Sequence, residues 1–465
     1  MKKRSLVLAT ILGLTTFTSA DTLEEAFKEG KVQGELKSFY INRTYDWGSG
    51  FARTPSKYTR DGLSVGGHLG YQTGSYYGFD AGATFYTTNK IDKKSSNPDK
   101  NDNTPFGSDG KGYSVLGEAY ISYGFDKTSI RVGRQSINTP FAAPNNFRML
   151  PNTFEGVVVK NSNISDTTLE LGHITKVQTN GFANSVPVPN STLDPTNANA
   201  RLSLLYGFGP GYEAGEFTSI SDVYLGKTNQ KSTAGMTYLN ATYTGFDGIK
   251  LEIWDQYIHD IMNIIVAKAS YKGRLSVFNT FASVFYTKQD DVGDNLLGKA
   301  FNTTGKDKDV DASQYGAMLK ASLDNGLGID LRYVNTPASK GSVLDGGIVN
   351  ALGGANPFII SQGALHANLG DTASYMLGID YNFKPLTGID LLSMVKYFEY
   401  DIGKYNGYQS GYEWKTKEVD FDLIYQVTKE FKLQARASFT KDWLDLGATK
   451  SLSFDEYRLI AYYKF

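Results

Sequence analysis

The last stretch of the chain, residues 455–465 (DEYRLIAYYKF), places the tightest constraint on the fold. Every second residue counted back from the end is apolar or aromatic, and those between are mostly polar; the apolar row is Phe465, Tyr463, Ala461, Leu459 and Tyr457. Side chains of a β-strand point alternately to opposite faces, so one face suits lipid or a core and the other suits water. An edge strand this apolar would promote aggregation of a soluble protein, whereas in a closed membrane barrel it pairs with the first strand. At about 3.3 Å per residue and a tilt of roughly 45°, this length covers the apolar band of an outer membrane.

The composition agrees with a membrane barrel. The mean hydropathy of −0.33 is too polar for a bundle of membrane helices. The 31 Tyr, 27 Phe and 49 Gly suit the aromatic girdles and the bends of a barrel whose lumen stays polar. The net charge of −1 argues against a nucleic-acid partner, and the absence of Cys excludes disulfides and thiolate metal ligands.

The start of the chain predicts export. Three basic residues at positions 2–4 precede an apolar run over 6–17 and small residues at 18–20, which is the pattern of a signal peptide spanning residues 1–20. In residues 21–31, Leu23, Ala26 and Phe27 have helical spacing, so we expect one short periplasmic helix there. Residues 32–465 are predicted to form the transmembrane barrel domain.

From residue 32 onward the hydrophobic pattern alternates with a period of two. We count eighteen alternating segments, with sixteen as the lower bound, separated by turn signals. Short connections at 125–128, 246–249, 272–274 and 384–389 alternate with long polar ones. That rhythm is typical of an all-β, antiparallel, up-and-down transmembrane barrel with short periplasmic turns and long extracellular loops.

The longest connections are residues 179–225 and 335–373. The second holds a Gly-rich and apolar tract, residues 346–360, in which Phe358, Ile359 and Ile360 are adjacent. A water-exposed loop has little reason to carry three such residues, and long loops in compact proteins are usually functional. We expect this loop to fold into the barrel mouth and narrow it; the alternative is that it packs on a neighbouring molecule.

Basic residues lie on the polar faces of several predicted strands. Since the last and first strands are neighbours in a closed barrel, we expect cations along one wall of the lumen: Lys37, Arg131, Lys396, Arg436 and Arg458. A column of cations in a narrow wet channel attracts anions, and arginine binds carboxylates in a bidentate manner. The alternative for any one of them is an ordinary lumen-facing residue or a headgroup anchor.

Several segments resemble the OprD family of substrate-specific outer-membrane porins. They are residues 67–88, 117–135, 253–263, the final strand and, above all, 133–156 (GRQSINTPFAAPNNFRMLPNTFEG). The resemblance implies an eighteen-stranded barrel whose third extracellular loop folds inward as a constriction. It also implies a ladder of basic residues that guides carboxylate-bearing nutrients through the bore.

The resemblance also suggests roles for individual residues. Arg131, Lys396, Arg436 and Arg458 stand where ladder residues are expected, and Lys37 has the position on the first strand. Gln434 departs from the pattern, because a second arginine is usual there. In the inward loop, the constriction candidates are Phe141, Asn145, Phe147 and Arg148.

The sequence therefore predicts a multi-pass porin of the bacterial outer membrane. It would allow passive, partly selective diffusion of small anionic or carboxylate-bearing solutes, with no cofactor, no metal and no enzymatic activity. The expected partners are outer-membrane lipid, the solutes and the barrel-assembly machinery, which would bind the strand that ends at Phe465. A monomer and a homotrimer both fit.

Two alternatives remain. One is a non-specific general diffusion porin. The other is a barrel hydrolase, but of the four histidines (His68, His173, His259 and His366) only His259 has an adjacent acid, Asp260, and no GxSxG motif occurs beside any of them. A calcium loop beginning at Asp99 would need Gly where Thr104 stands and Glu where Gly110 stands.

Overall fold

The computed structural model describes residues 20–51, 55–91, 100–107, 110–180, 196–207, 209, 213–228, 230–354, 358–359, 361–447 and 449–465. The signal peptide predicted for residues 1–20 lies outside the described residues except for Ala20.

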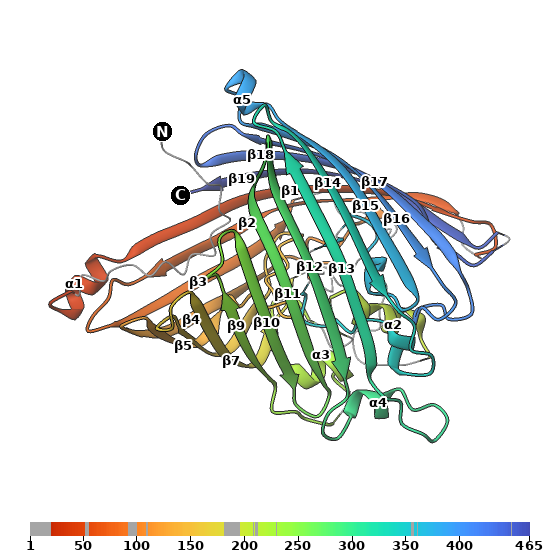
Figure 1. Ribbon diagram of the computed structural model, residues 1–465, viewed down its shortest axis with the longest axis horizontal. Coiled ribbons are helices and arrows are strands. Elements are labelled where there is room, and N and C mark those ends of the chain that lie inside the picture. The colour runs from red at the N-terminus through yellow and green to blue at the C-terminus, as the bar shows by residue number, and fades with distance from the viewer. Residues whose placement is uncertain are drawn as a thin grey trace.

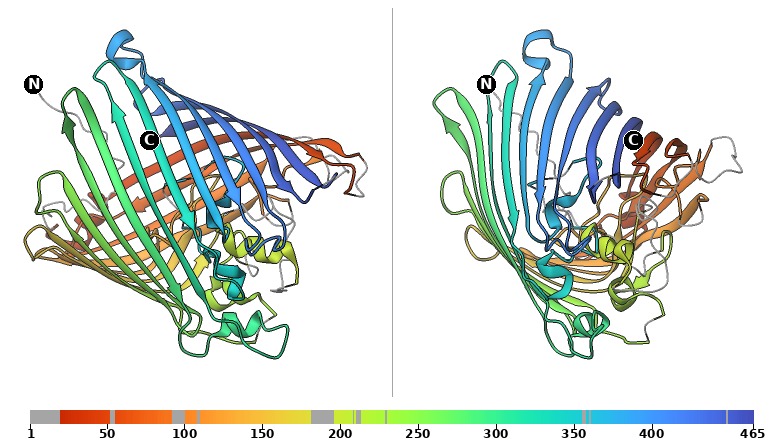
Figure 2. Two further views of the ribbon diagram at one scale, coloured as in Figure 1. Left: turned by 45° about the vertical axis from the view of Figure 1, so that its right-hand side comes forward. Right: turned by 90° about the vertical axis from the view of Figure 1, so that its right-hand side faces the viewer.

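Antiparallel strands form one barrel in which chain neighbours are also sheet neighbours (Figures 1 and 2). Within the described residues, eighteen strands make up the wall: β1 (Lys31–Trp47), β2 (Lys57–Gln72), β3 (Phe79–Lys90), β4 (Tyr113–Phe125), β5 (Thr128–Gln135), β6 (Thr153–Asn161), β7 (Thr167–Gln178), β9 (Met236–Tyr243), β10 (Ile249–Ile258), β11 (Met262–Leu275), β12 (Phe278–Asp290), β13 (Asp311–Ser322), β14 (Leu327–Thr336), β15 (Thr372–Asn382), β16 (Leu391–Ile402), β17 (Trp414–Gln426), β18 (Phe431–Asp445) and β19 (Ser451–Lys464). The two-residue β8 (Thr218–Ser219) pairs only with β7. The predicted fold class and the count of eighteen are confirmed.

The first and last strands close the barrel. β1 pairs with β19 from Glu35 opposite Lys464 to Trp47 opposite Leu452. At the chain end, the backbone groups of Gly34 and Phe465 exchange hydrogen bonds of 3.0 and 3.1 Å. No edge is left unpaired there, which a lipid environment requires because it offers no hydrogen bonds to the backbone.

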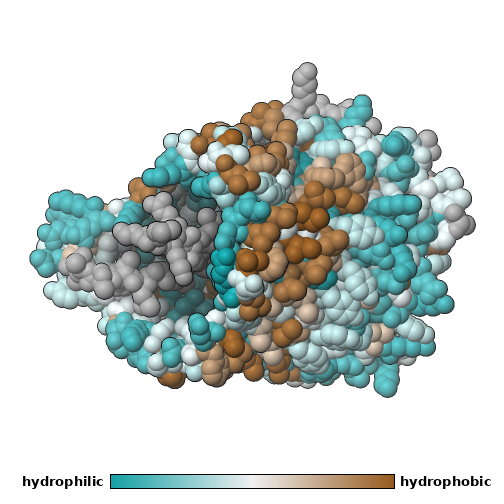
Figure 3. Space-filling view, turned by 45° about the horizontal axis from the view of Figure 1, so that its top comes forward, coloured by the Kyte–Doolittle hydropathy of each residue, from teal (hydrophilic) through white to brown (hydrophobic). Residues whose placement is uncertain are grey.

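The two faces of β19 confirm the alternation predicted from the sequence. Leu459 is 60% exposed on the outside, whereas Arg458 is 2% exposed on the inside. Outward apolar side chains recur around the wall, among them Leu36, Ile121 and Val284. Figure 3 shows the resulting apolar band across the outer surface, with hydrophilic surface on either side of it. Such a band flanked by polar rims is the shape that a membrane barrel needs.

Short helices lie at both ends of the barrel. Near the start of the chain, α1 (Leu23–Lys28) has a capping box between Thr22 and Glu25. The long connections carry α2 (Ala198–Leu205), α3 (Ile220–Leu225), α4 (Leu296–Ala300), η3 (Val343–Gly346) and η4 (His366–Asn368), and a short turn carries α5 (Lys384–Thr387). In Figure 1, α2, α3 and α4 gather at the lower right, and α1 and α5 lie away from them. No helix of the described residues has the length and apolar character to cross a bilayer.

One turn differs from the sequence prediction. We expected a connection at 272–274, but β11 continues to Leu275, and the turn lies at the next two residues, where Ser276 has a φ of 56°. Lys272, Gly273 and Arg274 mimic a turn in sequence. The alternation fades there because both faces of a strand are wet beyond the apolar band.

The β1–β2 contact depends on a glycine. Gly67 has a φ of +136°, and a Cβ atom at this position would lie 1.8 Å from the carbonyl oxygen of Glu35. We predict that Gly67→Ala lowers the fraction of folded, heat-modifiable barrel on gels run without boiling. Gly70→Ala is the matched control, because its Cβ would meet only the Thr84 hydroxyl, at 2.8 Å. Equal folding of both variants would contradict the prediction.

Candidate functional site

Two long connections fold into the bore. The first inner loop, residues 136–152, joins β5 to β6, and the second inner loop, residues 337–371, joins β14 to β15. Their apolar residues are buried, including Phe141, Leu150 and Phe358. The expectation that the 335–373 connection narrows the barrel therefore agrees with the described residues. Ile360, one of the apolar residues on which that expectation was based, lies outside them.

Lys37 and Gln256 hold the first inner loop from opposite sides. Lys37 on β1 donates to the carbonyl oxygen of Arg148 and lies 3.5 Å from that of Met149. Across the bore, Gln256 on β10 donates to the hydroxyl of Thr139 at 2.8 Å. Both anchors are buried, and they give hydrogen bonds to loop groups that cannot reach water.

Buried glutamine and glutamate side chains anchor the second inner loop. Gln289 on β12 donates to the carbonyl of Val349 at 2.8 Å and accepts from its amide at 2.9 Å. Gln314 on β13 donates to the carbonyl of Ala367 at 2.8 Å. Glu418 on β17 accepts from the amides of Gly363 and Ala364, both at 2.8 Å.

Apolar packing adds to these anchors and joins the two loops. The ring of Phe358 lies 4.4 Å from that of Phe285, which points inward from β12. The loops also contact each other, because Ala142 forms β-bridges with Leu352 and Gly353. The inner loops therefore form one packed plug rather than two separate flaps.

A histidine ties the second inner loop to the connection after β7 and to the barrel wall. His366 is fully buried, with Nδ1 bonded to the Tyr206 hydroxyl and Nε2 2.8 Å from the carbonyl oxygen of Trp443. The rings of Tyr400 and Trp414 lie 5.5 and 6.2 Å away. Burial lowers the pKa of His366 from 6.5 to about 3, so the imidazole is neutral at physiological pH.

Two arginines lie side by side on the wall. Arg436 on β18 is directly opposite Arg458 on β19 in the strand register, and both face the bore. Each has a carboxylate partner: Arg436 lies 3.0 Å from Asp422, and Arg458 pairs with Glu456. The carboxylates hold the guanidinium groups in place and offset part of their charge.

Other charged groups complete this wall. Lys396 points inward from β16 and interacts electrostatically with Asp422, Arg332 and Arg436. Glu456 also pairs with Arg43 on β1, which in turn lies 3.4 Å from Asp102. The wall thus carries alternating charges and not a bare column of cations.

Two residues of the predicted ladder differ from the rest. Lys37 is 2% exposed, and its ammonium group is hydrogen-bonded to the first inner loop, so it serves as an anchor. Arg131 is on β5, separated from Arg458 on β19 by four strands, whereas Lys396 on β16 is separated from Arg436 on β18 by one. The expectation that all five cations share one wall was therefore wrong for Arg131. Its guanidinium lies 4.0 Å from the Tyr120 ring and donates to Ser122 at 2.9 Å. The sequence pattern shows which face a residue takes but not how far around the barrel it lies.

The arginine pair borders a small cavity of about 20 Å³, here named the arginine cavity. Both inner loops and the wall line it: Phe147, Arg148, Ser361, Gln362, Leu365, Arg436 and Arg458. Arg458 also donates to the carbonyl oxygen of Gln362 at 3.2 Å. This space holds about one water molecule.

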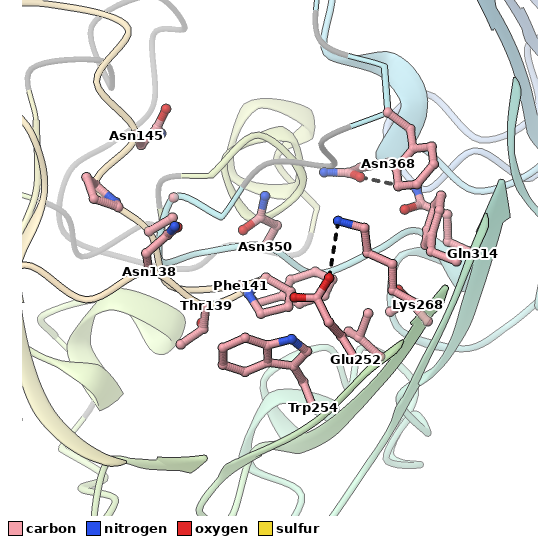
Figure 4. Close-up of a pocket in the computed structure, with 18 of the residues that line it drawn as sticks. Asn138, Thr139, Phe141, Asn145, Glu252, Trp254, Lys268, Gln314, Asn350 and Asn368 are labelled. Carbon is pink, nitrogen blue, oxygen red and sulfur yellow. Dashed lines mark hydrogen bonds and ion pairs between the residues drawn. The ribbon is translucent and has the colours of Figure 1, made fainter. Parts of the chain in front are cut away.

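A second cavity, of about 380 Å³, lies against the opposite wall and is here named the amide cavity (Figure 4). Its polar lining includes Asn138, Thr139, Asn145, Glu252, Lys268, Thr287, Gln314, Asn350 and Asn368. Its aromatic lining is Phe141, Phe147, Trp254, Phe285 and Phe358. Lys268 reaches toward Glu252 and lies 3.7 Å from it.

The four constriction candidates all border these cavities. Phe141 and Asn145 line the amide cavity, Arg148 lines the arginine cavity, and Phe147 lines both. Asn145 has a φ of 47°, which lets the first inner loop turn there. Their role in selecting solutes stays a prediction.

Sequence reasoning missed the anchors and the amide cavity. Gln256, Gln289 and Gln314 stand at inward positions in the alternation of their strands, and a glutamine that is buried there must find a partner. That signal was available. The sequence could not show the partners of these glutamines, because the loops that supply them are distant along the chain.

The comparisons with known proteins agree on one family and one fold. The family model described as "outer membrane porin, OprD family" matches residues 25–465. Pseudomonas aeruginosa OpdK, solved with vanillate, has 16% identity and a TM-score of 0.71, with 94% of this chain and 99% of that chain covered. OccK9 (OpdG) of the same organism has 19% identity and a TM-score of 0.71, with 95% and 100% covered. OccK2 (OpdF), also from P. aeruginosa and solved in complex with glucuronate, has 15% identity and a TM-score of 0.66, with 94% and 98% covered. The search of curated proteins gave no match.

The glutamine anchors can be tested by conductance. Gln289→Leu removes both hydrogen bonds to Val349 and leaves its backbone groups unpaired, at a cost of about 1–3 kcal/mol for each group. We predict a looser second inner loop, seen in planar bilayers as higher mean conductance and more frequent current fluctuations. Gln426→Leu, at the far end of β17, is the control and should conduct like the parent chain.

His366 predicts a dependence on pH. When the second inner loop detaches, the imidazole regains its ordinary pKa near 6.5, whereas in the packed plug the pKa is about 3. The packing is therefore most stable above pH 6.5 and loses about 1.4 kcal/mol for each pH unit below that value, down to about pH 3.

We predict that current fluctuations become more frequent as the pH falls from 7 to 4. His366→Gln, which cannot take up a proton in this range, should remove most of that change. A pH response that is identical in the parent chain and in this variant would contradict the assignment.

Proposed function

The chain belongs to the OprD family of outer-membrane porins, and on that basis we propose that its bore passes small anionic solutes that carry a carboxylate. It is a β-barrel channel of the bacterial outer membrane. The proposal concerns what moves through it. Diffusion would be passive and partly selective.

The adjacent pair Arg436 and Arg458 carries this proposal. Both guanidinium groups border the arginine cavity, with Arg148 of the first inner loop at the same cavity. Arg436 is the more accessible of the pair, because Arg458 is 2% exposed and donates to the carbonyl oxygen of Gln362. Arginine keeps its charge at all relevant pH values, and a carboxylate can accept two parallel hydrogen bonds from it. Lys396 lies within electrostatic reach of Arg436 and extends the positive region along the wall.

The ion partners of the arginines fit transient binding. Asp422 and Glu456 orient the guanidinium groups and reduce their net charge, so a passing carboxylate is attracted without being held tightly. Conduction requires binding that is favourable enough for entry and weak enough for release. The structural neighbours OpdK and OccK2 were solved with vanillate and glucuronate, both of which are carboxylates, and this supports the same solute class.

Two observations weigh against the alternatives. A general diffusion porin needs an open bore, whereas two inner loops are anchored inside this one and contact each other at Ala142. For a hydrolase, Asp260 would have to orient His259, but among the described residues its carboxylate accepts from the amide of Asp294 at 3.3 Å and makes no hydrogen bond to the imidazole. OprD-family porins are channels. Oligomeric state and contact with the barrel-assembly machinery through Phe465 stay predictions.

Ion selectivity tests the proposal. We predict that Arg436→Gln and Arg458→Gln each lower the anion-to-cation permeability ratio about fivefold, because a unit charge a few ångströms from a passing ion is worth about 1 kcal/mol even in water. The measurement is the reversal potential under a salt gradient, together with benzoate and gluconate uptake into liposomes. Lys417→Gln removes one positive charge from the outer face of β17 and is the control. Selectivity and uptake that survive both arginine substitutions would overturn the carboxylate route.

A further inference from the structure

The amide cavity differs in chemistry from the arginine cavity. Among the described residues its two charged lining groups are Glu252 and Lys268, which lie 3.7 Å apart, and Glu252 also pairs with Lys250 at 2.8 Å. The rest of its polar lining is amide and hydroxyl groups. Only Phe147 borders both cavities. The amide cavity is therefore a separate compartment of the bore, with few charged groups and many amide and hydroxyl groups.

Several polar groups at this cavity have no partner among the described residues. The Thr287 hydroxyl, on a residue that is 2% exposed, makes no hydrogen bond there. The indole N–H of Trp254 likewise makes none. The amide oxygens of Asn145 and Asn350 are buried and unpartnered, and Asn350 is 3% exposed. Of these groups, the oxygens of Asn145 and Asn350 are buried, and all four are available to hydrogen-bond a molecule that occupies the cavity.

The mixture of donors and acceptors restricts the ligand. A carboxylate only accepts hydrogen bonds, so it cannot satisfy the oxygens of Asn145 and Asn350. An ammonium group only donates, so it cannot use the N–H of Trp254. A hydroxyl group both donates and accepts, so several hydroxyls on one solute could satisfy the whole set.

The aromatic lining indicates the shape of the solute. Phe141 and Trp254 lie together beside the Glu252–Lys268 pair (Figure 4). The rings of Phe285 and Phe358, 4.4 Å apart and tilted by 36°, line the same cavity. Aromatic faces pack well against the C–H faces of a saturated ring. A volume of about 380 Å³ is within the range of small-ligand sites.

We propose that the amide cavity binds an uncharged carbohydrate of one or two rings. The rings of Trp254 and the phenylalanines pack against its apolar faces, and the side chains of Thr287, Asn145 and Asn350 bind its hydroxyls. The bore then offers neutral sugars a binding site whose groups are distinct from the arginine pair.

The experiment measures block of the ion current in planar bilayers by D-glucose and sucrose added over a concentration series. Tetraethylene glycol, a neutral solute of similar size without a hydroxyl-bearing ring, is the control probe. We expect saturable block by at least one of the two sugars and none by the glycol. Equal block by all three solutes, or no saturable block, would overturn the proposal.

Two variants locate the site. Thr287→Val and Trp254→Phe keep the volume or the aromatic face but remove a hydroxyl and an N–H, and each should weaken the sugar block about three- to tenfold. Tyr286→Phe removes a hydroxyl from the next residue of β12, on the outer face, and should behave like the parent chain. Heat-modifiable migration shows that each variant is folded. Block unchanged by both substitutions would overturn the assignment to this cavity.

The outcome of the sugar-block experiment can be told apart from the outcome of the ion-selectivity experiment on the carboxylate route. Arg436→Gln changes ion selectivity if that route is correct but should leave the sugar block unchanged. Sugar block that disappears with Arg436→Gln and persists in Thr287→Val would place the binding at the arginine cavity and contradict the inference.

Discussion

The backbone hydrogen bonds between β1 and β19 are the constraint on which the structure depends. In lipid an unpaired amide has no partner, so the sheet must close, and the register from Glu35–Lys464 to Trp47–Leu452 does this. Closure fixes which residues face inward. It puts Arg458, at an alternate position of the last strand, into the bore while Leu459 faces lipid. All the polar chemistry of the wall follows from this one requirement.

A closed barrel of this size would be a wide pore if nothing entered it. The two inner loops fill it, and their entry raises the same problem as closure, because loop amides and carbonyls lose their contact with water. Gln289, Gln314 and Glu418 solve it by reaching from the wall to loop backbone groups. Lys37 does the same for the first inner loop. A cation expected to meet solute is thus used to hold the constriction in place, which explains its burial.

The narrowed bore has two compartments of different character. The cavity beside Arg436 and Arg458 is small and lined by arginines with carboxylate partners, and the cavity against β10–β13 is larger and rich in aromatic and amide groups. The shared position of Phe147 means that the first inner loop sets the size of both. Selection in such a bore would depend on two kinds of chemistry: charge at one wall, and hydroxyl and ring recognition at the other.

The sequence alone determined the architecture, because strand alternation and the rhythm of short and long connections are local properties. The final strand showed both its faces correctly, and the apolar residues Phe358 and Ile359 pointed to a loop that leaves water. It also gave the side of each strand on which a basic residue lies. The tertiary structure decided everything that depends on distance around the barrel. Arg131 stands three strands from β1, Lys37 lies beneath a loop more than a hundred residues away, and Glu252 meets Lys268 only because β10 and β11 pair in one register. Alternation specifies a face, but closure and loop entry specify neighbours, and no local pattern contains that information.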